Sequence, residues 1–110
     1  MSLIDKSDKL MSYPHLDTDA FQELIEELCL ASEQDISYLL DHIEKHYEFE
    51  FPLWARLLCY RLALLQAPDN PDLLERAGQG ILLYADPFYD DIAKGYIRKA
   101  KEIRDRQYSL

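Results

Sequence analysis

Apolar residues recur along most of the chain at intervals of three and four, the spacing that places side chains on one face of an α-helix. In the first such segment they stand at Phe21, Leu24, Ile25 and Leu28. The pattern predicts five helices, over residues 18–30, 34–47, 52–66, 71–84 and 87–106. The breaks between them are short, so successive helices must pack as antiparallel neighbours. The predicted fold is therefore an all-α arrangement of five antiparallel helices.

Residues that start or stop helices stand at these boundaries. Ser32 can cap the second helix, and Pro52 suits the first position of the third. Pro68 ends the third helix, while Asn70 can cap the fourth and Pro71 can open it. These positions support the predicted helix boundaries.

The third helix is the candidate centre of the fold. It is apolar on nearly every side except at Arg56 and Arg61. A helix that is hydrophobic all round is expected to be covered all round. The leucines expected to form its core are Leu57, Leu58 and Leu62.

The N-terminal segment differs from the rest of the chain. Residues 1–12 are polar and lack a clear apolar period, so we expect a flexible leader there. Residues 13–110 are expected to form a single α-helical domain, because a chain of this length makes one core.

Charge is unevenly distributed along the chain, whose net charge is −9. Residues 1–51 hold 13 acids and three bases, whereas residues 94–110 hold six bases and two acids. Binding to nucleic-acid phosphates needs a cationic surface, so we expect no nucleic-acid partner. No apolar run is long enough to span a bilayer, and we expect no membrane partner. Cys29 and Cys59 stand in apolar helical patterns, which indicates reduced thiols and a cytoplasmic protein.

The chain resembles itself at an offset of 37 residues. Under this shift Asp35 falls on Asp72, Tyr47 on Tyr84 and Phe51 on Phe88. A period of this size is typical of stacked helical pairs.

From Tyr60 to Ile103 the sequence resembles the tetratricopeptide repeat. Pro68 stands where that repeat closes, and small residues follow at the expected spacing at Ala77, Gly78, Ala93 and Ala100. Small residues allow two helices to approach closely. Arg56 departs from the pattern, because a small residue is expected at its position.

The resemblance implies tetratricopeptide-like helical hairpins and a non-enzymatic role in protein binding, as an adaptor or a chaperone. In that family the first helices of the hairpins line the binding surface. The residues that this implies here are Tyr38, His42, Glu75, Gln79 and Leu82.

An alternative is an immunity or inhibitor protein that neutralises a basic toxin enzyme. Its binding face would use the acidic stripe Glu23, Glu26 and Glu27, because such a field attracts a basic partner. The partner on either hypothesis is another protein, basic or presenting an amphipathic helix, and self-association is a further option.

A small metal- or thiol-dependent enzyme is the less favoured hypothesis. His42 and His46 have a spacing that can chelate zinc, but no third ligand has recognisable spacing. Neither Cys29 nor Cys59 stands at a helix start beside cations, where the pKa of a thiol would fall. We therefore expect no catalytic residue, metal or cofactor.

Overall fold

The structure is a computed structural model and describes residues 3–12 and 18–108. In this part of the chain it is all-helical, without strands. The elements in order are α1 (Leu3–Met11), α2 (Thr18–Leu30), α3 (Glu33–His46), α4 (Leu53–Gln66), α5 (Pro71–Tyr84), the 3-10 helix η1 (Pro87–Tyr89) and α6 (Asp90–Tyr108).

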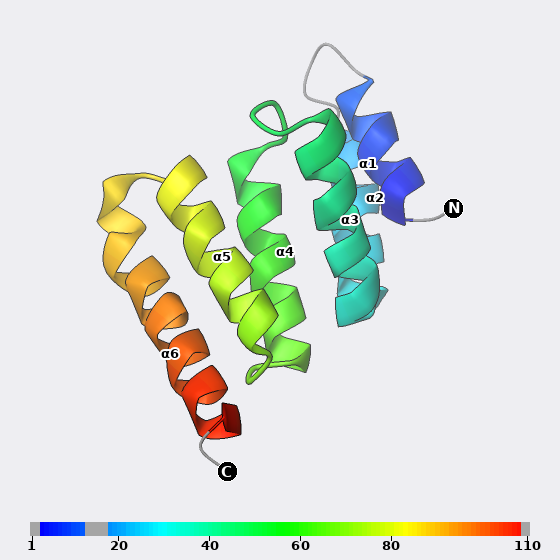
Figure 1. The fold of residues 1–110 in the computed structure, drawn as a ribbon. Helices are drawn as coiled ribbons and strands as arrows, with labels where there is room; N and C mark the ends of the chain where they lie inside the picture. Colours follow the sequence, from blue (N-terminus) through cyan, green and yellow to red (C-terminus); the bar gives the residue numbers. More distant parts are fainter. Residues whose placement is uncertain (1–2, 13–17, 109–110) are drawn as a thin grey trace.

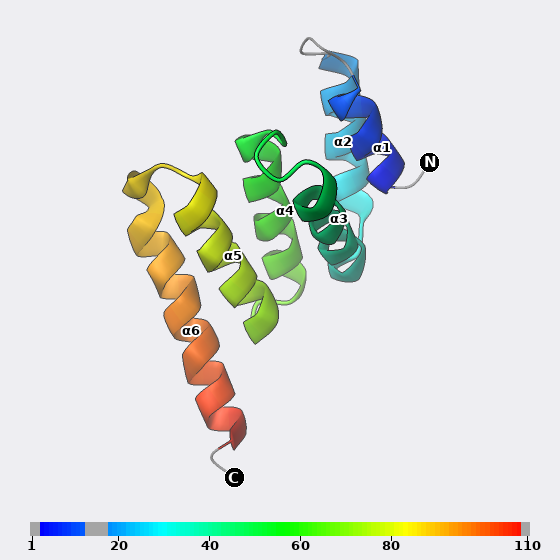
Figure 2. The same cartoon turned by 45° about the horizontal axis from the view of Figure 1, so that its top comes forward.

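The helices form an open row rather than a closed bundle. Helices α3, α4, α5 and α6 lie side by side and alternate in direction (Figure 1). The turned view places α6 at one end of the row and α1 with α2 at the other (Figure 2). The resulting molecule is elongated, with extents of 50 × 29 × 21 Å.

The predicted helix boundaries are confirmed to within one residue for α2, α3, α4 and α5. The Ser32 hydroxyl accepts a hydrogen bond from the Asp35 amide, and the Asn70 side chain accepts from the amides of Asp72 and Leu73. The fifth predicted helix instead starts as η1, capped by Asp86, and α6 then continues to Tyr108. Local capping chemistry therefore determines these ends.

The described residues form six α-helices rather than the five expected, because Leu3–Met11, within the segment expected to be a flexible leader, forms α1. Leu3, Ser7 and Leu10 are buried at the spacing of one helix face. They pack against α2 and α3. The middle position of this stripe is a serine rather than an apolar residue, so the apolar period that predicts a helix is interrupted. Residues 13–17 of the expected domain lie outside the described residues.

The central helix α4 buries a different face from the one expected. Leu57, Leu58 and Leu62 are only partly buried and pack at the edge of the core. The buried positions of α4 are Ala55, Arg56, Cys59, Tyr60 and Ala63. Small side chains on this face let the neighbouring helices approach α4 closely. Nor is α4 covered all round, since Leu65 is 77% exposed.

Helices α5 and α6 meet through small residues. A Cβ atom added at Gly78 would lie 2.6 Å from Ile97 Cγ1 and 2.7 Å from the Ala93 carbonyl oxygen, so only glycine permits this approach. A small cluster of Leu74, Ala100 and Ile103 lies at the same contact, separate from the main core. The expectation that small residues mark close helix approach is confirmed here.

None of the helices in the described residues is both long and apolar enough to cross a membrane.

Candidate functional site

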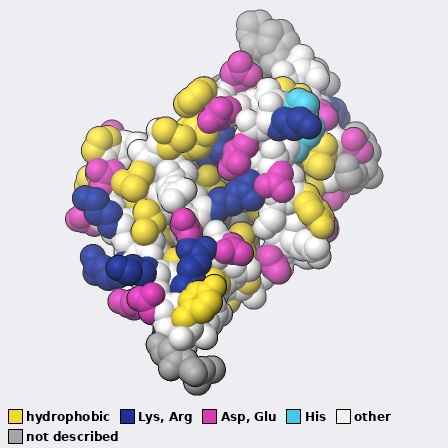
Figure 3. Space-filling model, in the orientation of Figure 1, with side chains coloured by type: hydrophobic (Ala, Val, Ile, Leu, Met, Phe, Trp, Pro, Cys, Tyr) yellow, Lys and Arg dark blue, Asp and Glu magenta, His cyan; other side chains and the backbone are white. Residues whose placement is uncertain are grey.

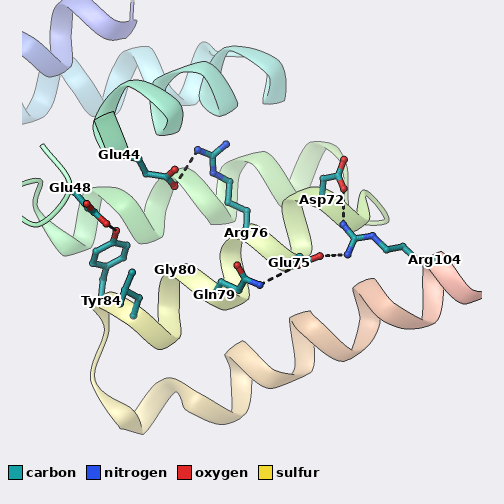
Figure 4. A pocket seen from close by; sticks show the side chains of 10 residues that line it. Glu44, Glu48, Asp72, Glu75, Arg76, Gln79, Gly80, Tyr84 and Arg104 are labelled. Atoms are coloured by element: carbon teal, nitrogen blue, oxygen red, sulfur yellow. Dashed lines mark hydrogen bonds and ion pairs between the residues drawn. The ribbon is translucent and has the colours of Figure 1, made fainter. Parts of the chain in front are cut away.

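Two adjoining hollows lie beside α5. The larger, which we call the polar hollow, has a volume of about 510 Å³ and lies between α3, α5 and α6 (Figure 4). Its lining residues are Glu44, Glu48, Asp72, Glu75, Arg76, Gln79, Gly80, Leu83, Tyr84 and Arg104. The smaller has a volume of about 240 Å³, and its walls carry polar as well as apolar groups; we call it the apolar hollow after the exposed Phe49, Leu53 and Leu83 at its rim. Its lining residues are Glu48, Phe49, Phe51, Leu53, Arg56, Leu83 and Tyr84. Because Glu48, Leu83 and Tyr84 line both, the two hollows adjoin, and we call them together the groove.

Two arginines pair with the acids on the walls of the polar hollow. Arg76 on α5 reaches α3, where its Nη2 atom lies 2.7 Å from Asp41 Oδ1 and 3.2 Å from Glu44 Oε1. Partial burial alone would lower the pKa of Arg76, but the two carboxylates raise it. This guanidinium is therefore charged and ties α5 to α3.

The second arginine ties α6 to α5. Arg104 on α6 pairs with Glu75, and its Nη2 atom lies 2.7 Å from Asp72 Oδ1 (Figure 4). Hydrogen bonds to these carboxylates raise the pKa of Arg104. Gln79 donates to Glu75 Oε1 over 3.2 Å, which orients the same carboxylate from within α5. The Arg104 pairs thus fix the wall that α6 contributes.

The junction of the two hollows is built around Tyr84 and Glu48. The Tyr84 hydroxyl donates to Glu48 Oε1 over 3.0 Å. Burial is the main cause that raises the pKa of Tyr84, and this hydrogen bond to a carboxylate raises it further, so the phenol stays protonated. Within the described residues no cation pairs with Glu48, which distinguishes it from the other acids of the polar hollow.

Arg56 forms the base of the apolar hollow. It is 1% exposed, and its guanidinium carbon lies 3.9 Å from the centre of the Tyr84 ring. Its Nη2 atom donates to the backbone carbonyl of Glu48. Among the described residues no carboxylate pairs with it. From the start of α4, Arg56 thus joins the α3–α4 loop to the end of α5.

The rim of the apolar hollow is exposed and hydrophobic. Phe49 is 75% exposed and Leu83 is 61% exposed, although both are bulky apolar side chains. The rings of Phe49 and Tyr84 pack edge to face, with centroids 5.6 Å apart. Hydrophobic side chains gather over the end of α5 and the beginning of α4 (Figure 3). Exposed apolar side chains gathered beside a hollow are typical of interaction sites.

The structure brings together only part of the predicted binding surface. Glu75 and Gln79 line the polar hollow, whereas Leu82 is partly exposed on α5 but lines neither hollow. Tyr38 lines a different pocket with residues of α1 and α2. His42 is engaged by α1, since its Nε2 atom lies 2.8 Å from Asp8 Oδ1. The surface predicted from the first helices is thus divided by the position of α1.

The acidic stripe on α2 is more neutralised than its sequence suggests. Glu23 Oε2 lies 2.9 Å from Lys9 Nζ and 3.3 Å from Lys6 Nζ, and hydrogen bonds to these lysines lower the pKa of Glu23. Glu26 Oε1 accepts a hydrogen bond from Gln22. Glu27 lines the pocket beside Tyr38. Both lysines belong to α1, the helix that sequence reasoning missed.

Sequence reasoning also missed the residues that define the groove, namely Glu48, Arg56, Arg76, Tyr84 and Arg104. One signal was present for Arg56, which is a cation inside an otherwise apolar helix. Another was present for Tyr84, which the 37-residue offset pairs with Tyr47. The ion pairs of Arg76 and Arg104 span 35 and 29 residues and carry no local pattern.

The histidines and cysteines of the metal- or thiol-dependent hypothesis lie in separate surroundings. The rings of His42 and His46 lie 4.6 Å apart, and the described residues contain no cluster of three or more side chains able to hold a metal ion. Burial raises the pKa of the Cys59 thiol to about 12. Cys29 is exposed on α2. No hydrogen bond among the described residues joins either thiol to these histidines.

Comparisons of this chain with known protein families, curated proteins and solved structures find no match.

Proposed function

We propose that this protein acts by binding another protein, as an adaptor or chaperone-like module without chemistry of its own. The groove receives a segment of the partner. The observation that carries this proposal is the exposure of Phe49 and Leu83 at the rim of a hollow that adjoins a polar one. Interfaces combine apolar anchor sites with polar groups that fix orientation, and the groove has both.

The state of the ionic groups supports binding rather than catalysis. Arg76 and Arg104 are engaged with carboxylates of the same chain, so they position the walls of the groove. A reactive cysteine needs a lowered pKa, and that of Cys59 is raised. His42 is already engaged by Asp8. These features leave the thiol- or metal-dependent alternative with little support.

The resemblance to the tetratricopeptide repeat agrees with this proposal in part. Glu75 and Gln79, which the resemblance implicates, lie in the groove, and Tyr38 and His42 do not line it. We place the protein in the cytoplasm, in agreement with the unpaired thiols of Cys29 and Cys59.

An inhibitor role based on the acidic stripe of α2 has weaker support. Glu23 is held between Lys6 and Lys9, so Glu26 and Glu27 remain as the acids that could attract a basic enzyme. Glu26 is exposed and Glu27 is half-buried, and two such acids exert only a short-ranged, salt-sensitive attraction.

Site-specific photo-crosslinking tests the proposal. A benzophenone amino acid is placed at Gln79 in the groove or, as a matched control, at Glu102, which is exposed on α6 and lines neither hollow. In cells of the native host, the Gln79 position should give a discrete crosslinked protein that the Glu102 position does not give. Equal crosslinking at both positions, or none at Gln79, would contradict binding in the groove.

A further inference from the structure

We propose that the segment received by the groove presents a bulky apolar side chain to the apolar hollow and a lysine or arginine beside it to Glu48. This inference rests on the proposed function and specifies the chemistry of the partner. It follows from the size of the apolar hollow and from the pairing of the acids around it.

The apolar hollow fits one large side chain. Its volume of about 240 Å³ is below the ~300–1,000 Å³ of sites for drug-sized ligands. Phe49, Leu53 and Leu83 are all exposed around it. Arg56 fixes its base through the Tyr84 ring and the Glu48 carbonyl, so the hollow is preformed. A bulky apolar side chain that enters the hollow removes Phe49, Leu53 and Leu83 from water, and the site need not reorganise.

Glu48 is the acid in the groove that is left for a cation from outside. Glu44 pairs with Arg76, and both Asp72 and Glu75 pair with Arg104. Among the described residues the Glu48 carboxylate accepts only a neutral hydroxyl, that of Tyr84, while the backbone carbonyl of Glu48 accepts from Arg56. A lysine or arginine of the partner would make a charge-assisted hydrogen bond to this carboxylate.

The total charge of the polar hollow favours the same partner. Its lining includes the acids Glu44, Glu48, Asp72 and Glu75 and the bases Arg76 and Arg104. Arg56, which lines the apolar hollow, adds a third base, so the four acids and three bases of the whole groove give a net charge of −1. This negative charge attracts a cation and disfavours an acidic segment. Because Glu48 also lines the apolar hollow, the cation and the apolar side chain must come from neighbouring positions of the partner.

Peptide selection tests this inference. A phage-displayed library of random dodecapeptides is selected on the whole chain, and a synthetic peptide of the consensus is titrated by fluorescence anisotropy. The consensus should pair a bulky apolar residue with a lysine or arginine within about one helical turn. Its affinity should fall as salt is raised, because screening weakens the contact with Glu48.

Two variants assign the contacts. Glu48→Gln keeps an acceptor for the Tyr84 hydroxyl and removes the charge, and it should weaken binding about fivefold or more. Leu83→Asp should weaken it about tenfold or more, because a carboxylate would line the apolar hollow.

The matched controls are Glu102→Gln and Leu65→Asp, which should leave affinity unchanged. Leu65 and Leu83 both stand one residue before the end of a 14-residue helix. Circular dichroism checks folding, and Phe49→Ser replaces Leu83→Asp if that variant unfolds.

The outcomes separate this inference from the proposed function. A consensus without a basic residue, bound equally by Glu48→Gln but weakened by Leu83→Asp, would overturn the inference and leave the groove as a binding site. If neither Leu83→Asp nor Phe49→Ser changes the affinity for the selected peptides, both the inference and the proposed function are overturned. If sedimentation shows a dimer that Leu83→Asp dissociates, a second copy fills the groove, and the inference is overturned.

Discussion

The guanidinium of Arg56 stacks on the ring of Tyr84, with its central carbon 3.9 Å from the ring centre. This contact joins the first turn of α4 to the last residue of α5. The Tyr84 hydroxyl in turn donates to Glu48, whose backbone carbonyl accepts from Arg56. Three segments that are distant in sequence are thereby held together at the junction of the groove.

Removal of this buried cation should destabilise the fold. Arg56→Ala loses a charged hydrogen bond, a cation–π contact and a buried side chain. The free energy of unfolding should therefore fall by about 2–4 kcal/mol. Arg61→Ala is the matched control, because Arg61 is exposed on the same helix, and it should change stability by less than about 0.5 kcal/mol. Urea denaturation measures both, and equal stabilities of the two variants would show that Arg56 is not a structural contact.

Two glycines should respond to alanine in opposite directions. A Cβ atom at Gly80 would lie 2.0 Å from the hydroxyl oxygen of the buried Tyr60, so Gly80→Ala should cost about 1–3 kcal/mol. Gly95 on α6 has no neighbour within 4 Å of an added Cβ atom, so Gly95→Ala should add about 0.5–1 kcal/mol. Thermal melts compare the two variants.

A double variant identifies the cause of the Gly80 effect. Tyr60→Phe removes the nearest clashing atom and should recover part of the loss caused by Gly80→Ala. If it recovers nothing, the clash lies elsewhere than at the hydroxyl.

The two cysteines should differ in reactivity. Burial raises the pKa of Cys59 to about 12, and the thiolate is the form that reacts. At pH 8 iodoacetamide should therefore label the exposed Cys29 in the folded protein and leave Cys59 unlabelled, and both should react in denaturant. Intact-protein mass spectrometry counts the labels. Rapid double labelling without denaturant would indicate that α4 opens readily.

The contact between α1 and α2 should weaken in acid. Lys9 and Lys6 lower the pKa of Glu23 below its ordinary value of 4.5, so the folded state favours the ionised carboxylate. The stabilisation is present above pH 4.5 and is lost as the pH falls through the lowered pKa. Glu23→Gln should thus be less stable than the parent at neutral pH, and the difference should vanish in acid. Urea denaturation across pH, with Glu102→Gln as the control, measures this; a difference independent of pH would contradict the role of ionisation.

Local signals predicted much of the fold. Caps at Ser32 and Asn70 and prolines at helix starts placed α3 and α5, because a helix end is decided by neighbouring residues. α1 was missed because its buried stripe includes Ser7. The buried face of α4 was also misplaced, because small residues such as Ala55 and Ala63 pack at close helix contacts that composition does not reveal.

The groove was harder to predict than the helices. Glu75 and Gln79 were identified through the repeat resemblance, and they do line the polar hollow. The contacts that shape the groove join residues far apart in sequence, such as Arg76 with Asp41 and Arg104 with Asp72. Which arginine meets which acid depends on how the helices stack, and no spacing along the chain encodes it.

Helix α6 packs mainly on α5, where Ala100 and Ile103 form a small cluster with Leu74, while Ala93 joins the main core. An edge helix of this kind can detach without unfolding the main core, as a separate cooperative unit. Arg104 leaves with it, so detachment removes one wall of the polar hollow. A ligand that contacts both walls binds only the form in which α6 is docked. Its binding therefore increases the free energy needed to detach α6. Amide protons of α6 should then exchange more slowly in the complex, which makes the C-terminal helix a reporter of groove occupancy.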